Sequence, residues 1–302
     1  MFKNNLRYFL AGIISVAIWG FFAIPLRSLQ AFKSEEILYY RTFVSLALIW
    51  VCILIFRKKQ FRKDIEFVKN ESKKNQRKLL LQIIASSVLL SLNWFTFIYA
   101  VNNVSITSGA FAYMVCPLIT AFAAYIFLKE QLSKVQFISL VIALISVCLL
   151  SSGSFIEVVW SVIIASLYTG YLIIQRNMKH VDKLNVLAVQ FIFSVLLMLP
   201  FYLYQHESVP ESGLFWGNIL LISILFTILP LFLSLYSLIG LPSSTLAIII
   251  YLNPIIAFMV AIFYFKVKID SHQIYAYTLL LFSVILFNSK LIKEVTSAKR
   301  TV

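Results

Sequence analysis

Ten long runs of apolar residues divide this chain, and they are apolar on all sides rather than at alternate positions. The runs fall at 8–26, 38–56, 79–101, 106–128, 135–151, 155–175, 184–204, 216–238, 243–265 and 273–289. Strands of an outer-membrane barrel would alternate with a period of two, and these runs do not. Because a hydrocarbon core about 30 Å thick needs about 20 apolar residues per helix, the pattern predicts an all-α membrane protein with ten transmembrane helices.

The composition agrees with this prediction and excludes a soluble catalytic domain. Hydrophobic residues make up 61% of the 302 residues, charged residues make up 13%, and the mean hydropathy is +0.91. Ten spans occupy roughly 200 residues, so little more than loops and termini remains. The sequence also lacks HExxH, GxSxG, P-loop and CxxC motifs. We therefore expect no enzyme, no cofactor and no metal site.

The charge distribution predicts the orientation in the membrane. A net charge of +14 would suggest nucleic acid as a partner for a soluble chain. Here 21 of the 26 Lys and Arg residues fall on one side of the predicted topology, and this side is cytoplasmic by the positive-inside rule. We expect a multi-pass protein of the cell (inner, cytoplasmic) membrane with both termini in the cytoplasm. The expected partner is the lipid bilayer and not nucleic acid.

The segment 57–78 is the most basic part of the chain, with ten Lys and Arg residues. We expect a solvated loop that anchors the topology. The alternative is that this segment binds anionic lipid headgroups.

The two halves of the chain repeat each other. At an offset of 137, residues 107–150 align without a gap on 244–287, with ten identities that include Pro117 with Pro254 and Lys129 with Lys266. We expect two five-helix domains, 1–151 and 152–302. Because five is odd, the two halves must enter the membrane in opposite directions, and such inverted repeats favour alternating access to a central site. The alternative is a duplication that only enlarged a stable bundle.

Candidate binding residues are the polar and aromatic side chains inside the predicted spans, where each needs a partner. They are Trp19, Arg41, Asn93, Trp94, Tyr99, Tyr113, Tyr168, Tyr251 and Asn253. Pro117 and Pro254 are expected helix kinks, because a proline frees the backbone carbonyl one turn earlier. For each residue the alternative is a structural role in helix packing or in an aromatic belt.

Arg41 is the only Lys or Arg inside a predicted span. It is either an interfacial arginine whose side chain reaches the headgroups or a fixed cation for a substrate carboxylate or phosphate. No Asp or Glu lies well inside a span, and Glu130 and Glu157 mark span ends. We therefore expect no buried carboxylate relay and a weak dependence of transport on the proton gradient.

Three short strings are distinctive. They are Glu36-Ile37-Leu38-Tyr39-Tyr40-Arg41, Asn93-Trp94 followed by Ala100-Val101-Asn102-Asn103, and Phe127-Leu128-Lys129-Glu130. Together with the two halves, they resemble the drug/metabolite transporter superfamily, most closely its EamA branch and the RarD-like proteins within that branch. The resemblance covers about residues 7–290. Cys116 stands where such proteins place an Asn before the proline of span four, and Val267 stands where they place an acidic residue after span nine.

The resemblance implies an integral membrane exporter or exchanger of small metabolites, such as amino acids or related compounds, with a cavity between the repeats. A small-molecule substrate is therefore an expected partner. The alternative function is a non-transporting membrane scaffold or assembly partner. The sequence leaves the substrate, the direction of transport, the coupling ion and the oligomeric state open.

Overall fold

The computed structural model describes residues 2–103, 106–150, 155–178, 180–205, 209–266 and 271–290, and these residues form helices joined by short loops. No strand occurs among them. The elements are α1 (Phe2–Gly20), α2 (Ala23–Arg27), α3 (Ser34–Phe56), α4 (Lys58–Asn70), α5 (Lys73–Asn103), α6 (Ile106–Phe127), α7 (Lys134–Leu150), α8 (Phe155–Asn177), α9 (Lys183–Gln205), α10 (Gly213–Leu221), the π-helix η1 (Ile222–Ile228), α11 (Leu229–Gly240), α12 (Ser243–Ile250), α13 (Leu252–Phe263) and α14 (Ser271–Phe287).

Six helical segments are long and apolar enough to cross a membrane. They are Leu6–Arg27, Glu35–Phe56, Lys73–Phe97, Val158–Asn177, Lys183–Gln205 and Gly213–Gly240. Four shorter apolar helices, Ala112–Phe127, Lys134–Leu149, Ser243–Ala257 and Ile274–Phe287, occupy the other predicted spans. The expectation of an all-α, multi-pass membrane protein is confirmed, with six full-length spans and four shorter ones in the described part of the chain.

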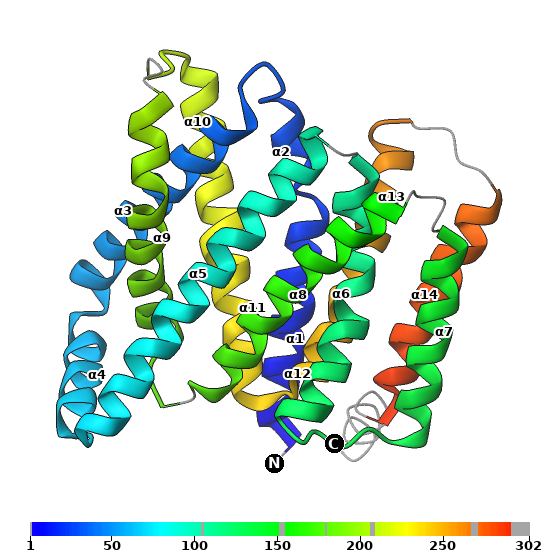
Figure 1. The fold of residues 1–302 in the computed structure, drawn as a ribbon, viewed down its shortest axis with the longest axis horizontal. Helices are drawn as coiled ribbons and strands as arrows, with labels where there is room; N and C mark the ends of the chain where they lie inside the picture. Colours follow the sequence, from blue (N-terminus) through cyan, green and yellow to red (C-terminus); the bar gives the residue numbers. More distant parts are fainter. Residues whose placement is uncertain are drawn as a thin grey trace.

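Equivalent helices of the two halves run in opposite directions (Figure 1). The start of α1, the helix α4 and the end of α14 lie at one end of the bundle, which we call the α4 face. Helix α6 runs toward this face, whereas its repeat partner, α12 with α13, runs away from it. Helices α7 and α14 are opposed in the same way. The halves are therefore inverted, as the odd number of spans per half requires.

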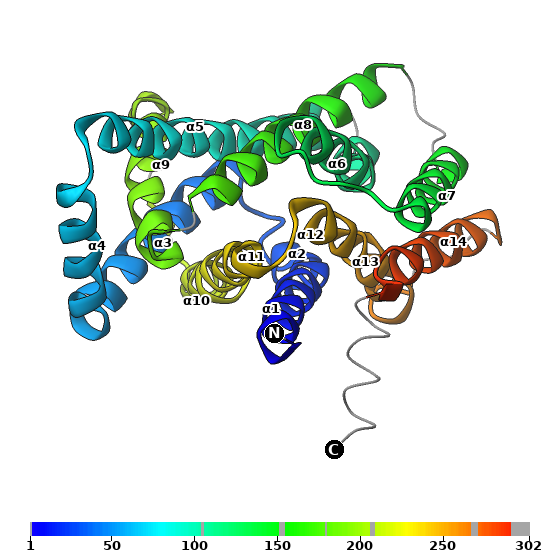
Figure 2. The same cartoon turned by 90° about the horizontal axis from the view of Figure 1, so that it is seen from below.

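The helix packing repeats with the same symmetry (Figures 1 and 2). Helix α1 packs on α11 as α8 packs on α5, and α1 packs on α12 and α13 as α8 packs on α6. The pairs α3 with α9, α6 with α12 and α7 with α14 each join one helix to its own counterpart. The centre of the molecule is therefore shared by the two halves.

The same turn ends α6 and α13 at opposite ends of the bundle. Lys129 and Lys266 follow these helices and have φ angles of 54° and 55°, and no other non-glycine residue in the described ranges has a positive φ. The left-handed conformation costs an L-residue roughly 1–2 kcal/mol. Its occurrence at both positions of one aligned pair is a backbone signature of the internal repeat.

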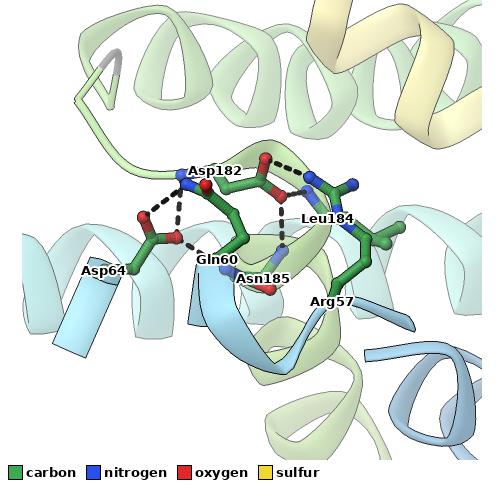
Figure 3. A network of polar contacts seen from close by, with 6 residues as sticks. All are labelled: Arg57, Gln60, Asp64, Asp182, Leu184 and Asn185. Atoms are coloured by element: carbon green, nitrogen blue, oxygen red, sulfur yellow. Dashed lines mark hydrogen bonds and ion pairs between the residues drawn. The ribbon is translucent and has the colours of Figure 1, made fainter. Parts of the chain in front are cut away.

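The basic segment 57–78 is helical rather than the loop we expected. It forms α4 and the first turns of α5. Asp64 on α4 is buried and accepts hydrogen bonds from the Asp182 backbone N–H at 3.0 Å and from Asn185 Nδ2 at 2.6 Å. The Asp182 carboxylate accepts from the Leu184 N–H and pairs with Arg57 at 2.8 Å. Figure 3 shows how this network fastens α4 to the start of α9.

Candidate functional site

Five of the nine predicted binding residues come together in the middle of the bundle. They are Arg41 of α3, Trp94 of α5, Tyr113 of α6, Tyr168 of α8 and Tyr251, which separates α12 from α13. Each lies near at least one other residue of the group or near Cys116. Tyr113 lies within electrostatic range of Arg41 and of Tyr168. Cys116 lies within the same range of Tyr168 and Tyr251. We call these six residues, with Tyr171, the central cluster.

Arg41 points across the bundle rather than along its own helix to the interface. Its guanidinium carbon lies 4.9 Å from the centre of the Trp94 ring. Trp94 is nine residues from the end of α5 at Asn103, or about 13 Å along the helix axis. This position favours the fixed cation over the interfacial arginine. No ion pair is recorded for Arg41 within the described ranges, and its buried Nε has no hydrogen-bond partner.

Three buried phenols add unused hydrogen-bonding capacity to the cluster. The hydroxyls of Tyr168, Tyr171 and Tyr251 are buried and complete no hydrogen bond. Tyr168 faces Ser234 and Tyr171 faces Gln175, but neither pair reaches hydrogen-bond geometry. Buried polar groups normally have a partner. A set of unpartnered groups that Tyr113 connects to one cation is therefore a candidate site for a polar ligand.

The other four predicted residues serve helix packing in this conformation or face outward. Asn93 is buried and donates to the Ile164 carbonyl of α8 at 2.9 Å. Trp19 donates through Nε1 to the Phe226 carbonyl at 3.0 Å. Tyr99 is 42% exposed and packs against Trp160, with ring centres 5.1 Å apart. The carbonyl oxygen of Asn253 lies 3.5 Å from the position that a Cβ on Gly20 would occupy.

Prolines explain two local departures from regular helix. Pro230 has no N–H for the carbonyl four residues earlier, and this carbonyl, on Phe226, accepts the Trp19 indole. Phe226 lies in η1, which is the first departure. Ser223, also in η1, donates its hydroxyl to the Arg41 carbonyl at 3.1 Å. The second departure is the turn at Tyr251, three residues before Pro254. Helix α6, in contrast, continues through Pro117.

Sequence reasoning missed two members of the cluster, Tyr171 and Cys116. Tyr168, Tyr171 and Gln175 follow each other at spacings of three and four, which place them on one face of α8. This polar-aromatic stripe is a signal that could have identified Tyr171. Cys116 was not among the predicted binding residues, although it directly precedes Pro117 inside a predicted span. The side chains of Asn102, Asn103 and Glu157 lie outside the part of the chain that the structure describes.

Glu130 joins the two halves at the α4 face. Its carboxylate accepts from the backbone N–H groups of Ser243 and Ser244 at 2.8 and 3.0 Å, and from the Ser244 hydroxyl at 2.7 Å. These groups begin α12, so the carboxylate binds the positive end of that helix. Arg176 lies within electrostatic range of Glu130 and donates to the Leu238 carbonyl. We call these contacts the Glu130 latch.

The chemistry of the site is that of binding. In the ranges that the structure describes, no group of three or more His, Cys, Asp and Glu side chains is arranged to hold a metal. The central cluster combines one cation, an indole face, phenols and a thiol. Such groups can hold a small polar or aromatic molecule through charge, stacking and hydrogen bonds.

Comparisons with known proteins place the fold and the family. The sequence profile of the EamA-like transporter family matches residues 6–152 and 155–289. "Uncharacterized transporter YojE" of Bacillus subtilis is 23% identical over 95% of both chains. "Protein RarD" of Streptomyces exfoliatus is 26% identical over 85% of this chain and 80% of its own.

A solved crystal structure aligns over 94% of this chain and 98% of its own, with a TM-score of 0.73 and 15% identity, which shows a shared fold. The Bacillus subtilis relative is named as a transporter, and neither of these two relatives is named as an enzyme. The profile matches nearly the whole chain, and the helices form two inverted halves. This chain therefore belongs to the EamA-like transporter family of the drug/metabolite transporter superfamily.

Proposed function

We propose that the protein exports or exchanges small metabolites by alternating access, with the central cluster as its binding site. The observation that carries the proposal is a half-buried arginine with a buried, unused Nε donor, which Tyr113 connects to the unpartnered phenol of Tyr168 between two inverted halves. A cluster shared by both halves can open first to one side of the membrane and then to the other.

The chemistry of the cluster favours a substrate that carries a carboxylate, such as an amino acid or a related compound. A guanidinium forms strong charge-assisted hydrogen bonds with carboxylates. Trp94 and the phenols offer aromatic faces and hydroxyls for the remainder of such a molecule. No Asp or Glu side chain among the described residues lies in the cluster, which supports exchange or facilitated transport rather than a proton relay.

We also propose that the α4 face is cytoplasmic and that the protein resides in the cell membrane. The basic segment 57–78 and the loops that follow α6 and α8 lie at this face (Figure 1). A Lys and Arg excess is typical of cytoplasmic loops. Impermeant thiol reagents applied to intact cells test this orientation: we expect a cysteine at Lys59 to be protected and a cysteine at Glu211 to be labelled.

The test of function is uptake by purified protein in liposomes. Vesicles preloaded with a mixture of amino acids and organic acids are supplied with one radiolabelled compound at a time. We expect saturable counterflow for at least one carboxylate-bearing compound. A folded protein that shows no flux or counterflow for any compound would favour the scaffold alternative. Loss of flux in Trp94→Ala and Tyr168→Phe, with normal flux in Tyr99→Phe, would assign the site to the central cluster.

A further inference from the structure

A second polar feature lies outside the central cluster, in a groove of about 660 Å³ beside the first turns of α5. One part of the groove is basic and is lined by Lys73, Lys74, Arg77 and Lys78. The other part is lined mainly by apolar residues, among them Leu81, Ala85 and Ile174 of α8. The α5 residues follow each other from the basic to the apolar part over about 18 Å of helix.

The four basic side chains are exposed and have no recorded hydrogen bond or ion pair. The nearby acidic groups are engaged elsewhere. Glu71 accepts from Asn75 at 2.6 Å, Asp64 is held by Asn185, and Asp182 pairs with Arg57 (Figure 3). No ion pair joins these four side chains to a described carboxylate, so the groove keeps an excess of positive charge.

We propose that this groove binds an anionic phospholipid. The phosphate would lie among the basic side chains, and an acyl chain would follow the apolar part along α5 and Ile174. The order of the two parts supports a lipid over a soluble anion, because the basic part is at the α4-face end of the span and the apolar part continues into it. Basic pockets between membrane helices at the cytoplasmic side are suited to such headgroups.

Lipid binding is tested by thermal unfolding of the purified protein in a neutral detergent, with added phosphatidylglycerol or phosphatidylcholine. We expect phosphatidylglycerol alone to raise Tm. In Lys74→Gln/Arg77→Gln the rise should disappear, with roughly tenfold to thirtyfold weaker lipid binding by native mass spectrometry. The matched control is Lys58→Gln/Lys59→Gln on α4, which removes the same charge outside the groove and should keep the rise.

Four results would overturn the proposal. They are no rise with phosphatidylglycerol, an equal rise with phosphatidylcholine, an equal loss in both double variants, and an equal rise with glycerol 3-phosphate, which would indicate a soluble-anion site. If the groove variant does not fold, Ala85→Trp fills the apolar part without changing charge and should abolish the rise; a full rise in that variant would also contradict a lipid site. Because the measurement is binding, its outcome is independent of transport.

Discussion

Arg41 is a charged side chain whose environment helix packing alone does not explain. Removing a cation from water is costly unless the cation is paired and hydrogen-bonded. Stacking on Trp94 returns about 0.5–2 kcal/mol, and the Nε donor remains unused. A side chain held in this way is pre-organised for an anion, because its position is fixed before the ligand arrives. An anionic ligand that pairs with Arg41 would then offset the desolvation cost of its guanidinium.

We predict that Arg41→Gln reduces uptake of a carboxylate substrate by roughly tenfold or more, because hydrogen bonds to charged groups contribute about 1.5–3 kcal/mol. Uptake of the corresponding neutral amide should change much less. The measurement is initial uptake into proteoliposomes for both compounds. Arg27→Gln is the control, since Arg27 also stacks on an aromatic ring, that of Phe265 at 4.7 Å, but is exposed and outside the cluster.

Equal losses for the two compounds in Arg41→Gln would show that Arg41 holds the helices and does not read the substrate charge. Thermal unfolding of the same variant separates these roles. A binding arginine can be replaced with little loss of stability, or with a gain, because a desolvated cation has been removed.

At the scale of elements, close contact between helices depends on positions without a side chain. A Cβ on Gly20 of α1 would lie 2.6 Å from Ile256 of α13, and the clashing atoms are the Cβ and Cγ2 of Ile256, close to its backbone. Such an atom cannot move away without moving the helix. The α1–α13 contact joins the two halves. The absence of a side chain at Gly20 therefore allows the halves to approach this closely.

We predict that Gly20→Ala destabilises the protein by about 1–3 kcal/mol, as overpacking of a core does, and lowers Tm in detergent. Gly217→Ala in α10 is the matched control, because a Cβ there meets nothing within 4 Å. That variant should keep or raise Tm, since Ala is favoured over Gly in a helix by up to about 1 kcal/mol. A similar Tm for both variants would contradict the close packing of α1 on α13.

The arrangement of spans could be predicted from sequence because the bilayer imposes a length and an apolar surface on every helix. The 137-residue offset likewise predicted opposite directions for α6 and α13. The rotation of each helix could not be predicted in this way, since spans such as α6 and α7 are apolar all round and carry no preferred face. Tyr99 of α5 is an example. It lies inside a predicted span and was therefore placed in the site, but its helix turns it toward Trp160.

Polar partners across the bundle were also beyond the sequence. The pairing of Asp64 with Asn185 joins residues 121 positions apart, and neither residue carries a local signal of the other. The π-helical η1 has no clear sequence signature except the proline that follows it. Its consequence, a free Phe226 carbonyl for Trp19, depends on tertiary contact.

For the whole molecule, the two ends of the bundle are chemically different although the helix packing is symmetric. The Glu130 latch joins the first half to α12 of the second at the α4 face. The 137-residue offset pairs Glu130 with Val267, which lies outside the described residues and whose side chain cannot accept such bonds. A carboxylate at a helix start stabilises one conformation, and a ligand-driven opening must overcome it.

We predict that Glu130→Gln shifts the protein toward a state open at the α4 face, because the amide loses the charge that binds the start of α12 and presents a donor to its N–H groups. The reporter is Ser234→Cys, a buried position beside Tyr168, with Cys52, Cys116 and Cys148 replaced by Ala. Alkylation from the α4 face should accelerate roughly tenfold. A loss of about 1.4 kcal/mol in the stabilisation that the latch gives to the joined state raises the open population by that factor. Glu66→Gln on exposed α4 is the control and should leave the rate unchanged. Unchanged alkylation in Glu130→Gln, accompanied only by a lower Tm, would reduce the latch to a helix cap.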